Sequence, residues 1–300
     1  PNHMLLVSEM TQIWESYDSG RTFKQINNDF WGAKVFDIAI AKDSQERIYV
    51  SNIGVGISEL PLTEQDWRHL TGSPDYAYRI EVDPEDSDIL YATYSPKIFE
   101  NHSSIWRYTR DQSENFGWSE IFRINNSRGI TSLTFDKSLP DRIYVGVIGK
   151  EGTIYVSYDK GKTWRKLNDQ LTFTTIWGHS QLQIDPANKD IVYAGTWGGG
   201  TYKTTDGGKD WFLLDMNHTF SPTWLAISEK NPSIVYACDR TGAKIHRSND
   251  SGRTWYTYYD FGKDYMLTSV VVIDPRDPDL IYASAFIPPM AHQGSFVKIK

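Results

Sequence analysis

The sequence lacks several features that would mark particular classes of protein. Cys238 is the only cysteine among 300 residues, so no intrachain disulfide can form. No apolar run is long enough to span a bilayer, and no run of basic residues is present. The net charge of -7 at pH 7 disfavours nucleic acid or an anionic membrane as a partner. We therefore expect no membrane insertion and no nucleic-acid partner.

Aromatic residues, in contrast, are abundant. They make up 14% of the chain, with 11 Trp and 18 Tyr, which is typical of β-rich proteins because aromatic side chains suit half-buried pleated surfaces. The sequence shows no helical periodicity. Short apolar segments separated by turn-forming residues take its place, and they favour an all-β fold.

An eight-residue pattern, Ser-x-Asp-x-Gly-x-Thr-Trp, recurs along the chain. Its best copy covers residues 157–164, and related copies cover residues 16–23, 204–211 and 248–255. The Asp can accept hydrogen bonds from backbone N–H groups just ahead of it, and the Gly can adopt positive φ, so the pattern predicts a tight turn between two strands. The structural carboxylates are those of Asp18, Asp159, Asp206 and Asp250. A calcium loop is disfavoured because each turn holds one carboxylate and no bidentate Glu.

A second phrase, of the Ile-Tyr-Ala type, predicts a buried strand before each turn. Its tyrosines are Tyr49, Tyr91, Tyr144, Tyr193, Tyr236 and Tyr282. Their mean spacing of roughly 47 residues lies in the range of propeller blades. Another apolar strand, often closed by Asp-Pro, comes before each phrase. Each repeat therefore predicts four strands, the composition of a β-propeller blade.

The repeats predict a single β-propeller domain over residues 1–300. We expect seven blades of four antiparallel strands, with both terminal blades incomplete. The turn pattern has decayed near Asp66-Trp67 and near Gly117-Trp118, whereas the strand phrases of those blades persist. The first blade begins at its second strand and the last ends at its third. Two alternatives stay open, a seven-bladed ring in which two ragged blades meet, or a fragment of a longer chain.

The turn pattern resembles the Asp box, or bacterial neuraminidase repeat. That repeat is found in sialidases, sortilin-type receptors, xyloglucan-hydrolysing glycosidases and photosystem II assembly factors. The resemblance covers nearly the whole chain and implies a propeller fold, whereas those proteins share little besides the turn. Sialidases also carry an Arg-Ile-Pro phrase where this chain has Arg79-Ile80-Glu81, which speaks against sialidase activity. The xyloglucan enzymes hold their catalytic aspartates between two propellers, so a single propeller would resemble half of such an enzyme.

Ligands of propellers usually bind on the face opposite the Asp turns. The loops expected there contain the residues that we predict to bind a ligand, which are Trp177, Trp197, Trp31, Trp224 and His179. Flat aromatic faces suit the C–H surfaces of sugar rings and can anchor a peptide. Packing in the channel or between blades is the alternative for any one of these aromatic residues.

Glycoside hydrolysis, which the resemblance suggests, requires a pair of carboxyl groups. The candidate acids on the loop face are Asp29, Asp37, Asp75, Glu100, Asp215, Asp239 and Asp264, and the sequence singles out no pair among them. The histidines come from different repeats without a ligand spacing, so we expect no metal and no cofactor. Cys238 lies in an apolar strand pattern and is predicted to be a buried thiol.

The first hypothesis for function is a non-catalytic recognition module that binds a glycan or a polypeptide. The alternatives are a glycoside hydrolase, or one half of a two-propeller glycosidase, and a scaffold for protein assembly. The resembling families and triplets such as Asn101-His102-Ser103 favour an extracellular or cell-surface location. A cytoplasmic location stays open, because we interpret residues 1–3 as a cloning remnant and their lack of a signal peptide decides nothing.

Overall fold

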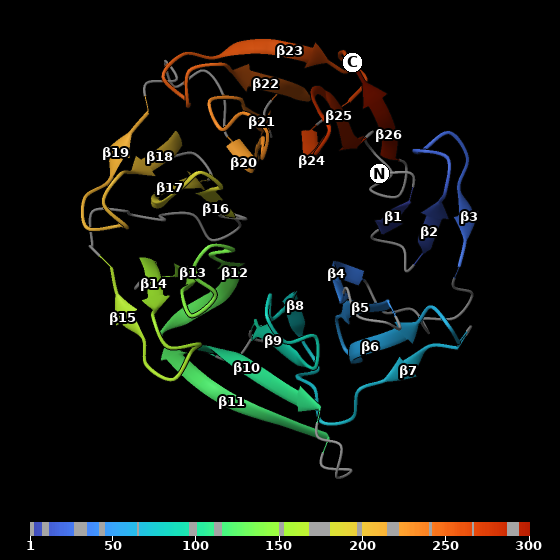
Figure 1. The fold of residues 1–300 in the computed structure, drawn as a ribbon, viewed down its shortest axis with the longest axis vertical. Coiled ribbons are helices and arrows are strands. Elements are labelled where there is room, and N and C mark those ends of the chain that lie inside the picture. Colours follow the sequence, from blue (N-terminus) through green and yellow to red (C-terminus); the bar gives the residue numbers. More distant parts are fainter. Residues whose placement is uncertain are drawn as a thin grey trace. The chain divides into compact units, whose positions relative to one another are not determined.

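The computed structural model describes most of the chain. The described residues are 3–7, 12–26, 35–41, 46–64, 66–95, 101–110, 116–149, 153–167, 181–196, 200–214, 222–239, 242–265, 267–286 and 294–300. Within these ranges the strands form seven antiparallel sheets, and no helix is found that could cross a membrane (Figure 1). The predicted fold class is confirmed, since the chain is an all-β, seven-bladed β-propeller.

The chain divides into two compact units. The N-terminal unit comprises residues 2–151 and 156–165, and the C-terminal unit comprises residues 152–155 and 166–300. The division runs through the fourth sheet. The sheets are numbered 1 to 7 along the chain.

The first four sheets are meanders in which strands pair in chain order. Sheet 1 contains β1 (Met4–Val7), β2 (Ile13–Ser16) and β3 (Lys24–Gln25). Sheet 2 contains β4 (Val35–Ala41), β5 (Arg47–Asn52), β6 (Gly56–Pro61) and β7 (Arg68–His69). Sheet 3 contains β8 (Ala77–Val82), β9 (Ile89–Tyr94), β10 (His102–Arg110) and β11 (Phe116–Asn125). Sheet 4 contains β12 (Ser127–Phe135), β13 (Ile143–Gly149), β14 (Thr153–Ser157) and β15 (Arg165–Lys166).

The remaining sheets follow the same order of pairing. Sheet 5 contains β16 (Gln181–Asp185), β17 (Asn188–Thr196), β18 (Gly200–Thr204) and β19 (Phe212–Leu213). Sheet 6 contains β20 (Pro222–Ile227), β21 (Val235–Asp239), β22 (Lys244–Ser248) and β23 (Tyr256–Asp260). Sheet 7 contains β24 (Leu267–Asp274), β25 (Asp277–Phe286) and β26 (Gly294–Ile299).

The two three-stranded sheets are the incomplete blades that the sequence predicts. In sheet 1 the turn 16–23 lies between β2 and β3, so its strands correspond to the second, third and fourth strands of a complete sheet. In sheet 7 the Asp274-Pro275 turn lies between β24 and β25, so its strands are the first three. First strands pack side by side within each unit, β4 on β8 and β8 on β12, and likewise β16 on β20 and β20 on β24.

The tyrosine of each Ile-Tyr-Ala phrase lies buried in the second strand of its sheet. In four sheets the residue opposite it on the third strand is a cation that lies over the ring. The pairs are Tyr91 with Arg107, Tyr193 with Lys203, Tyr236 with Arg247 and Tyr282 with Lys298, with cation-to-centroid distances of 6.0, 4.8, 5.3 and 5.7 Å. The long side chains thus cover tyrosine rings that pack at the faces between sheets.

The repeated turns are built by hydrogen bonds from their Ser and Asp side chains. Ser157 Oγ donates to Asp159 Oδ1 at 2.8 Å and accepts from the Gly161 N–H at 2.8 Å. Asp159 also accepts from the N–H and the hydroxyl of Thr163, at 2.8 and 2.5 Å. The Trp164 indole donates to the Gly161 carbonyl at 3.0 Å. Equivalent Ser or Thr and Asp bonds form around Asp18, Asp206 and Asp250.

The turn 157–164 packs on the preceding sheet of the N-terminal unit. The buried Tyr91 hydroxyl donates to the Lys160 carbonyl at 3.1 Å. Lys160 and Gly161 both adopt positive φ, 56° and 83°, which turns that carbonyl toward sheet 3. A Cβ on Gly161 would lie 2.7 Å from Ile121 Cδ1, so the turn approaches sheet 3 more closely than any other residue type allows.

The C-terminal unit repeats this tyrosine–turn bond between sheets 5 and 6. The Tyr193 hydroxyl donates to the Ser251 carbonyl at 3.1 Å. A Cβ on Gly252 would lie 2.6 Å from Leu214 Cδ1. The turn pattern therefore has two tasks, closing a hairpin and fastening that hairpin to the preceding sheet.

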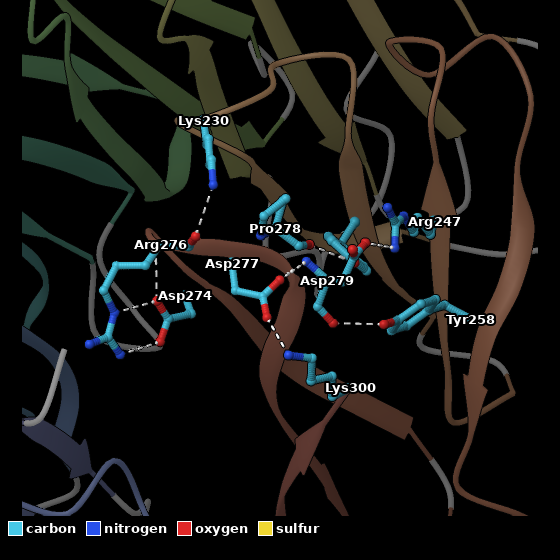
Figure 2. A network of polar contacts seen from close by, with 10 residues as sticks. Lys230, Arg247, Tyr258, Asp274, Arg276, Asp277, Pro278, Asp279 and Lys300 are labelled. Carbon is cyan, nitrogen blue, oxygen red and sulfur yellow. Dashed lines mark hydrogen bonds and ion pairs between the residues drawn. The ribbon is translucent and has the colours of Figure 1, made fainter.

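Sheet 7 has no such turn among its described residues, and the start of β25 takes its place against sheet 6 (Figure 2). The Tyr236 hydroxyl donates to the Pro278 carbonyl at 2.9 Å, and the Tyr258 hydroxyl donates to the Asp279 carbonyl at 2.7 Å. Arg247 Nη1 lies 2.6 Å from Asp279 Oδ1. The same buried tyrosine position thus serves the same purpose with a different partner.

Sheets 2 and 3 are joined by two ion pairs, each with one buried member. Arg110 of β10 donates to Glu59 of β6, and Arg47 Nη2 lies 2.8 Å from Asp88 Oδ1. Arg110 also interacts with the Tyr49 hydroxyl. Glu59 and Arg47 are only 2% and 4% exposed, so loss of Arg110 or Asp88 would leave a buried charge without its counter-ion.

Replacing Gly161 by Ala tests the close approach of the turn. We expect Gly161→Ala to lower the free energy of unfolding by about 1 to 3 kcal/mol more than a matched glycine variant, because the new methyl group must displace Ile121. The control is Gly54→Ala, since Gly54 has a similar φ of +86° but nothing within 4 Å of the added Cβ. Urea unfolding measures both. Equal losses of unfolding free energy in the two variants would show that backbone conformation alone explains why residue 161 is glycine.

Candidate functional site

The predicted binding residues fall mostly outside the described part of the chain. This holds for Trp31, Trp177, Trp197 and His179. The fifth residue, Trp224, lies in β20, is partly buried and packs against a core cluster shared by sheets 6 and 7. The contacts of Trp224 are therefore those of a residue that packs between blades, and its role in binding stays a prediction.

The Asp carboxylates of the four turns accept hydrogen bonds from other groups of the same turn. Each accepts hydrogen bonds on both oxygens. The hydroxyl and N–H of Thr254 lower the pKa of Asp250 to about 2, and Thr22 and Thr163 lower the pKa values of Asp18 and Asp159 in the same way. These groups are ionised at neutral pH and engaged in closing hairpins.

Polar side chains on the first strands of the N-terminal unit link neighbouring sheets. The strand register shifts just before Asp37 in β4, Arg79 in β8 and Ser132 in β12, and such bulges re-aim the side chain that follows. Asp37 Oδ2 accepts from the Ile80 N–H at 3.2 Å. Arg79 Nε donates to the Thr131 carbonyl at 2.8 Å. Each bond joins one sheet to the next.

The C-terminal unit contains an equivalent bond made by an amide. Gln181 Oε1 accepts from the Leu225 N–H at 2.6 Å. Gln181 occupies the position of Asp37, because each lies opposite the second residue after the buried tyrosine of its sheet. An amide cannot transfer a proton as a carboxyl group does, so this position serves the packing of sheets.

A second carboxyl group, Glu81 of β8, lies near Asp37. Burial and the charge of Asp37 raise the pKa of Glu81 to about 8, and the Arg79 guanidinium opposes this shift. Burial also raises the pKa of Asp37, whose Oδ1 lies 3.7 Å from Arg79 Nη1. Glu81 therefore keeps its proton at neutral pH. Sequence reasoning did not select Glu81, because its proximity to Asp37 depends on how β4 and β8 pack.

A cluster of aromatic residues lies on a predicted ligand loop of the C-terminal unit. The Phe261 ring lies 5.0 Å from that of Tyr259 and 5.4 Å from that of Tyr265. All three are partly exposed, while Tyr259 and Phe261 also pack against the core cluster of sheets 6 and 7. The cluster leaves part of its aromatic surface in solvent.

A more elaborate arrangement lies on sheet 3, where one face of the sheet gathers Tyr94, His102, Trp106, Glu120 and Arg123. We call this the ribbon surface. The Trp106 indole donates to the buried Ser104 hydroxyl at 2.8 Å. Arg123 donates through Nε and Nη2 to the two oxygens of Glu120, both at 2.7 Å. The rings of Tyr94 and His102 stack with centroids 5.6 Å apart.

The sequence analysis did not select Trp106, Glu120 or Arg123. These three belong to a hairpin whose turn pattern has decayed, so no repeat marks their register. One signal was present, since the spacing from Tyr91 to Tyr144 is the longest between successive phrase tyrosines.

Of the remaining candidate residues for catalysis or metal binding, those that the structure describes are either buried in the fold or exposed without forming a cluster. Cys238 is buried in the core cluster, where burial raises the pKa of its thiol, so the prediction of a buried thiol is confirmed. Asp239 is buried with its Oδ2 at 3.7 Å from His246 Nε2, whereas Asp75 and Asp264 are exposed. In the described ranges no three His, Cys, Asp or Glu residues gather as metal ligands. The other candidate acids, Asp29, Glu100 and Asp215, lie outside the described residues.

The raised pKa of Glu81 predicts how stability depends on pH. The folded chain holds this proton up to about pH 8, whereas a Glu in the unfolded chain releases it near 4.5, so the free energy of unfolding falls as pH rises between these values. We expect Glu81→Gln to remove about 3 to 4 kcal/mol of that decline. Urea unfolding at pH 5 and 8.5 measures it, with Asp264→Asn as the exposed control. A decline of unchanged size in Glu81→Gln would assign it to other groups.

Comparison with known proteins shows several propellers at low identity. A family model described as Sortilin-Vps10 (sortilin, neurotensin receptor 3) matches residues 152–286. Xyloglucanase Xgh74A of Acetivibrio thermocellus is 25% identical over 222 residues, covering 61% of this chain and 25% of that protein. A xyloglucanase of Hypocrea jecorina is 27% identical over 174 residues, covering 53% and 18%. The chain thus spans a quarter or less of the length of these two relatives.

Solved structures share the fold. YCF48 from Cyanidioschyzon merolae superposes with a TM-score of 0.70 at 13% identity, covering 100% of this chain and 91% of that one. A structure titled YCF48 bound to D1 peptide gives 0.69 at 15% identity, covering 95% and 86%. The GH74 enzyme of Niastella koreensis gives 0.66 at 18% identity, covering 83% and 40%. The chain is therefore a β-propeller that resembles sortilin-type and xyloglucanase proteins at low sequence identity.

Proposed function

We propose that this chain is a non-catalytic recognition module that binds a glycan or a polypeptide. The observation that carries this proposal is the ribbon surface, where Trp106 is held by Ser104 beside the paired Glu120 and Arg123. Partly exposed aromatic rings with ordered polar neighbours are typical of binding surfaces, because the rings lose little conformational freedom on contact. The aromatic cluster at Phe261 is a second surface of this kind.

The relatives support binding of either ligand class. The proteins similar in sequence are named xyloglucanases, which favours a glycan. One structure similar in fold is a complex with a peptide, which favours a polypeptide. A propeller fold serves many functions, so these names support both ligand classes and do not decide between a glycan and a polypeptide.

The alternative of a glycoside hydrolase has one observation in its favour, the protonated Glu81 near Asp37. A general acid and an ionised partner are what glycoside hydrolysis requires. Two findings speak against this role. The Asp37 carboxylate accepts from the N–H groups of Ile38 and Ile80, and the amide of Gln181 takes its place in the other unit. The pair is therefore better explained as part of the packing between first strands.

The same proposal includes the class of the repeated turns and the extent of the domain. We assign the four Ser-x-Asp-x-Gly-x-Thr-Trp turns to the Asp-box class, and we assign residues 1–300 to one propeller domain of that class. The geometry around Asp18, Asp159, Asp206 and Asp250 supports this assignment. An extracellular or cell-surface location fits the sortilin-type match.

Binding without turnover is the test of this function. We expect the chain to bind members of a glycan array or a peptide array, and to release no reducing ends from any bound oligosaccharide during a long incubation. Asp37→Asn and Glu81→Gln should bind like the parent chain, because neither residue belongs to the ribbon surface or to the aromatic cluster. Reducing-end release that disappears in either variant would replace this proposal by the hydrolase.

A further inference from the structure

Sheet 3 differs from the other complete sheets in its outer strands. The fourth strands β7, β15 and β19 contain two residues each and β23 contains five, whereas β11 contains ten and pairs with the nine-residue β10. The pairing of β10 and β11 shifts register between Ile105 and Trp106. Sheet 6 has the same kind of shift between Ile245 and His246, so the length of β10 and β11 is what sets sheet 3 apart.

The polar groups around Trp106 form a connected set. Glu120 lies opposite Trp106 across the ladder, and Arg123 lies opposite Ser104. Ser104 accepts the indole N–H and also interacts with the Glu120 carboxylate. The indole N–H is therefore already used, and what the partly exposed Trp106 side chain offers a ligand is its apolar ring face.

The charges of the ribbon surface are balanced. Arg123 lowers the pKa of Glu120, so the two groups remain an ion pair at neutral pH. Their side chains are 50% and 23% exposed, so the pair stands in reach of a ligand. An ionic ligand would have to compete with this pair. A neutral ligand with hydroxyl groups would use the planar carboxylate and guanidinium as they stand, donating to the Glu120 carboxylate and accepting from the Arg123 guanidinium.

A polypeptide would use a different part of sheet 3. β10 is paired on both sides, by β9 and β11, so its backbone is closed to an added strand. Only β11, the last strand of the sheet, has an edge that could pair with a peptide, and this edge does not include the Trp106 ring. The ring and the ion pair therefore suit a sugar better than a peptide.

We infer that the ribbon surface binds a neutral oligosaccharide, with one pyranose ring on the face of Trp106 and its hydroxyls on Glu120 and Arg123. This inference rests on the proposed recognition function and names its ligand class. The stacked rings of Tyr94 and His102 extend the surface toward a second sugar ring. The order of these groups along β10 runs from His102 to Trp106, so a linear oligosaccharide would lie along the strand.

The experiment is isothermal titration with neutral cello-, xylo-, manno- and galacto-oligosaccharides, with anionic oligogalacturonate and a peptide library as further arms. We expect a neutral oligosaccharide to bind, and Trp106→Ala to weaken that binding by about tenfold or more. The control is Phe212→Ala, which removes a ring that is 60% exposed on β19, and it should leave the affinity unchanged. Trp106→Phe keeps a ring face and should retain most of the affinity.

Nitrogen-15 NMR of the indole groups covers the case in which Trp106→Ala fails to fold. The signal missing from the spectrum of Trp106→Phe identifies Trp106, and it should shift when the neutral oligosaccharide is added. An unmoved signal, or equal affinities for Trp106→Ala and the parent chain, would overturn the inference. Binding of peptides alone, or of oligogalacturonate alone, would also overturn it while leaving the recognition function in place. If the chain hydrolysed a sugar and this activity required Trp106, the non-catalytic recognition function would be wrong, whereas the ribbon surface would remain the sugar site.

Discussion

The contact between a buried tyrosine and the turn of the next sheet is the interaction on which this propeller depends. A sheet with a fourth strand of only two residues gains little from its own ladder, so its outer edge has to be held by a neighbour. The bond from Tyr91 to Lys160 supplies such a contact for sheet 4, and the bond from Tyr193 to Ser251 fastens the turn of sheet 6 in the same way, although its fourth strand has five residues. The turn sequence follows from it. Positive φ aims the carbonyl at the tyrosine, glycine permits the close approach, and the Asp and Ser side chains satisfy the backbone of the loop.

The need to close turns and hold neighbouring sheets together explains why an acidic chain has so few carboxylates left for catalysis. Asp159 and its equivalents close hairpins, and Asp83, Asp185 and Asp274 accept N–H bonds in the turns that connect first and second strands. Asp37 links two first strands with a bond that Gln181 repeats elsewhere. These carboxylates are engaged by donors that come from the fold itself. A surface with aromatic rings and a balanced ion pair is consequently a better place for a ligand than a pair of carboxyl groups.

The sequence predicts whatever recurs with the repeat, and it fails where a feature occurs once. The strand phrases and the Asp turns recur at a regular spacing, so each copy strengthens the prediction of the others. The two incomplete sheets follow from where this repeat begins and ends in the sequence. The cation over four of the tyrosines could have been found from the position opposite on the third strand, but Arg107, Lys203 and Arg247 follow no common motif. The pairing of Glu81 with Asp37 and the network around Trp106 depend on packing and on a bulge. Neither is visible in one strand read alone.

Sheet 3 shows how a repeat can acquire a special surface without weakening the fold. Its outer hairpin has lost the turn pattern, and within the described residues no turn carbonyl accepts from the Tyr49 hydroxyl of sheet 2. Arg110 at the end of β10 interacts with the Tyr49 hydroxyl instead and pairs with the buried Glu59, while Arg47 pairs with Asp88. These ion pairs take over the junction between sheets 2 and 3. Because the junction no longer depends on the shape of the hairpin, β10 and β11 are free to lengthen, whereas the register shift at Trp106 lies inside the ladder, opposite the buried Ala92.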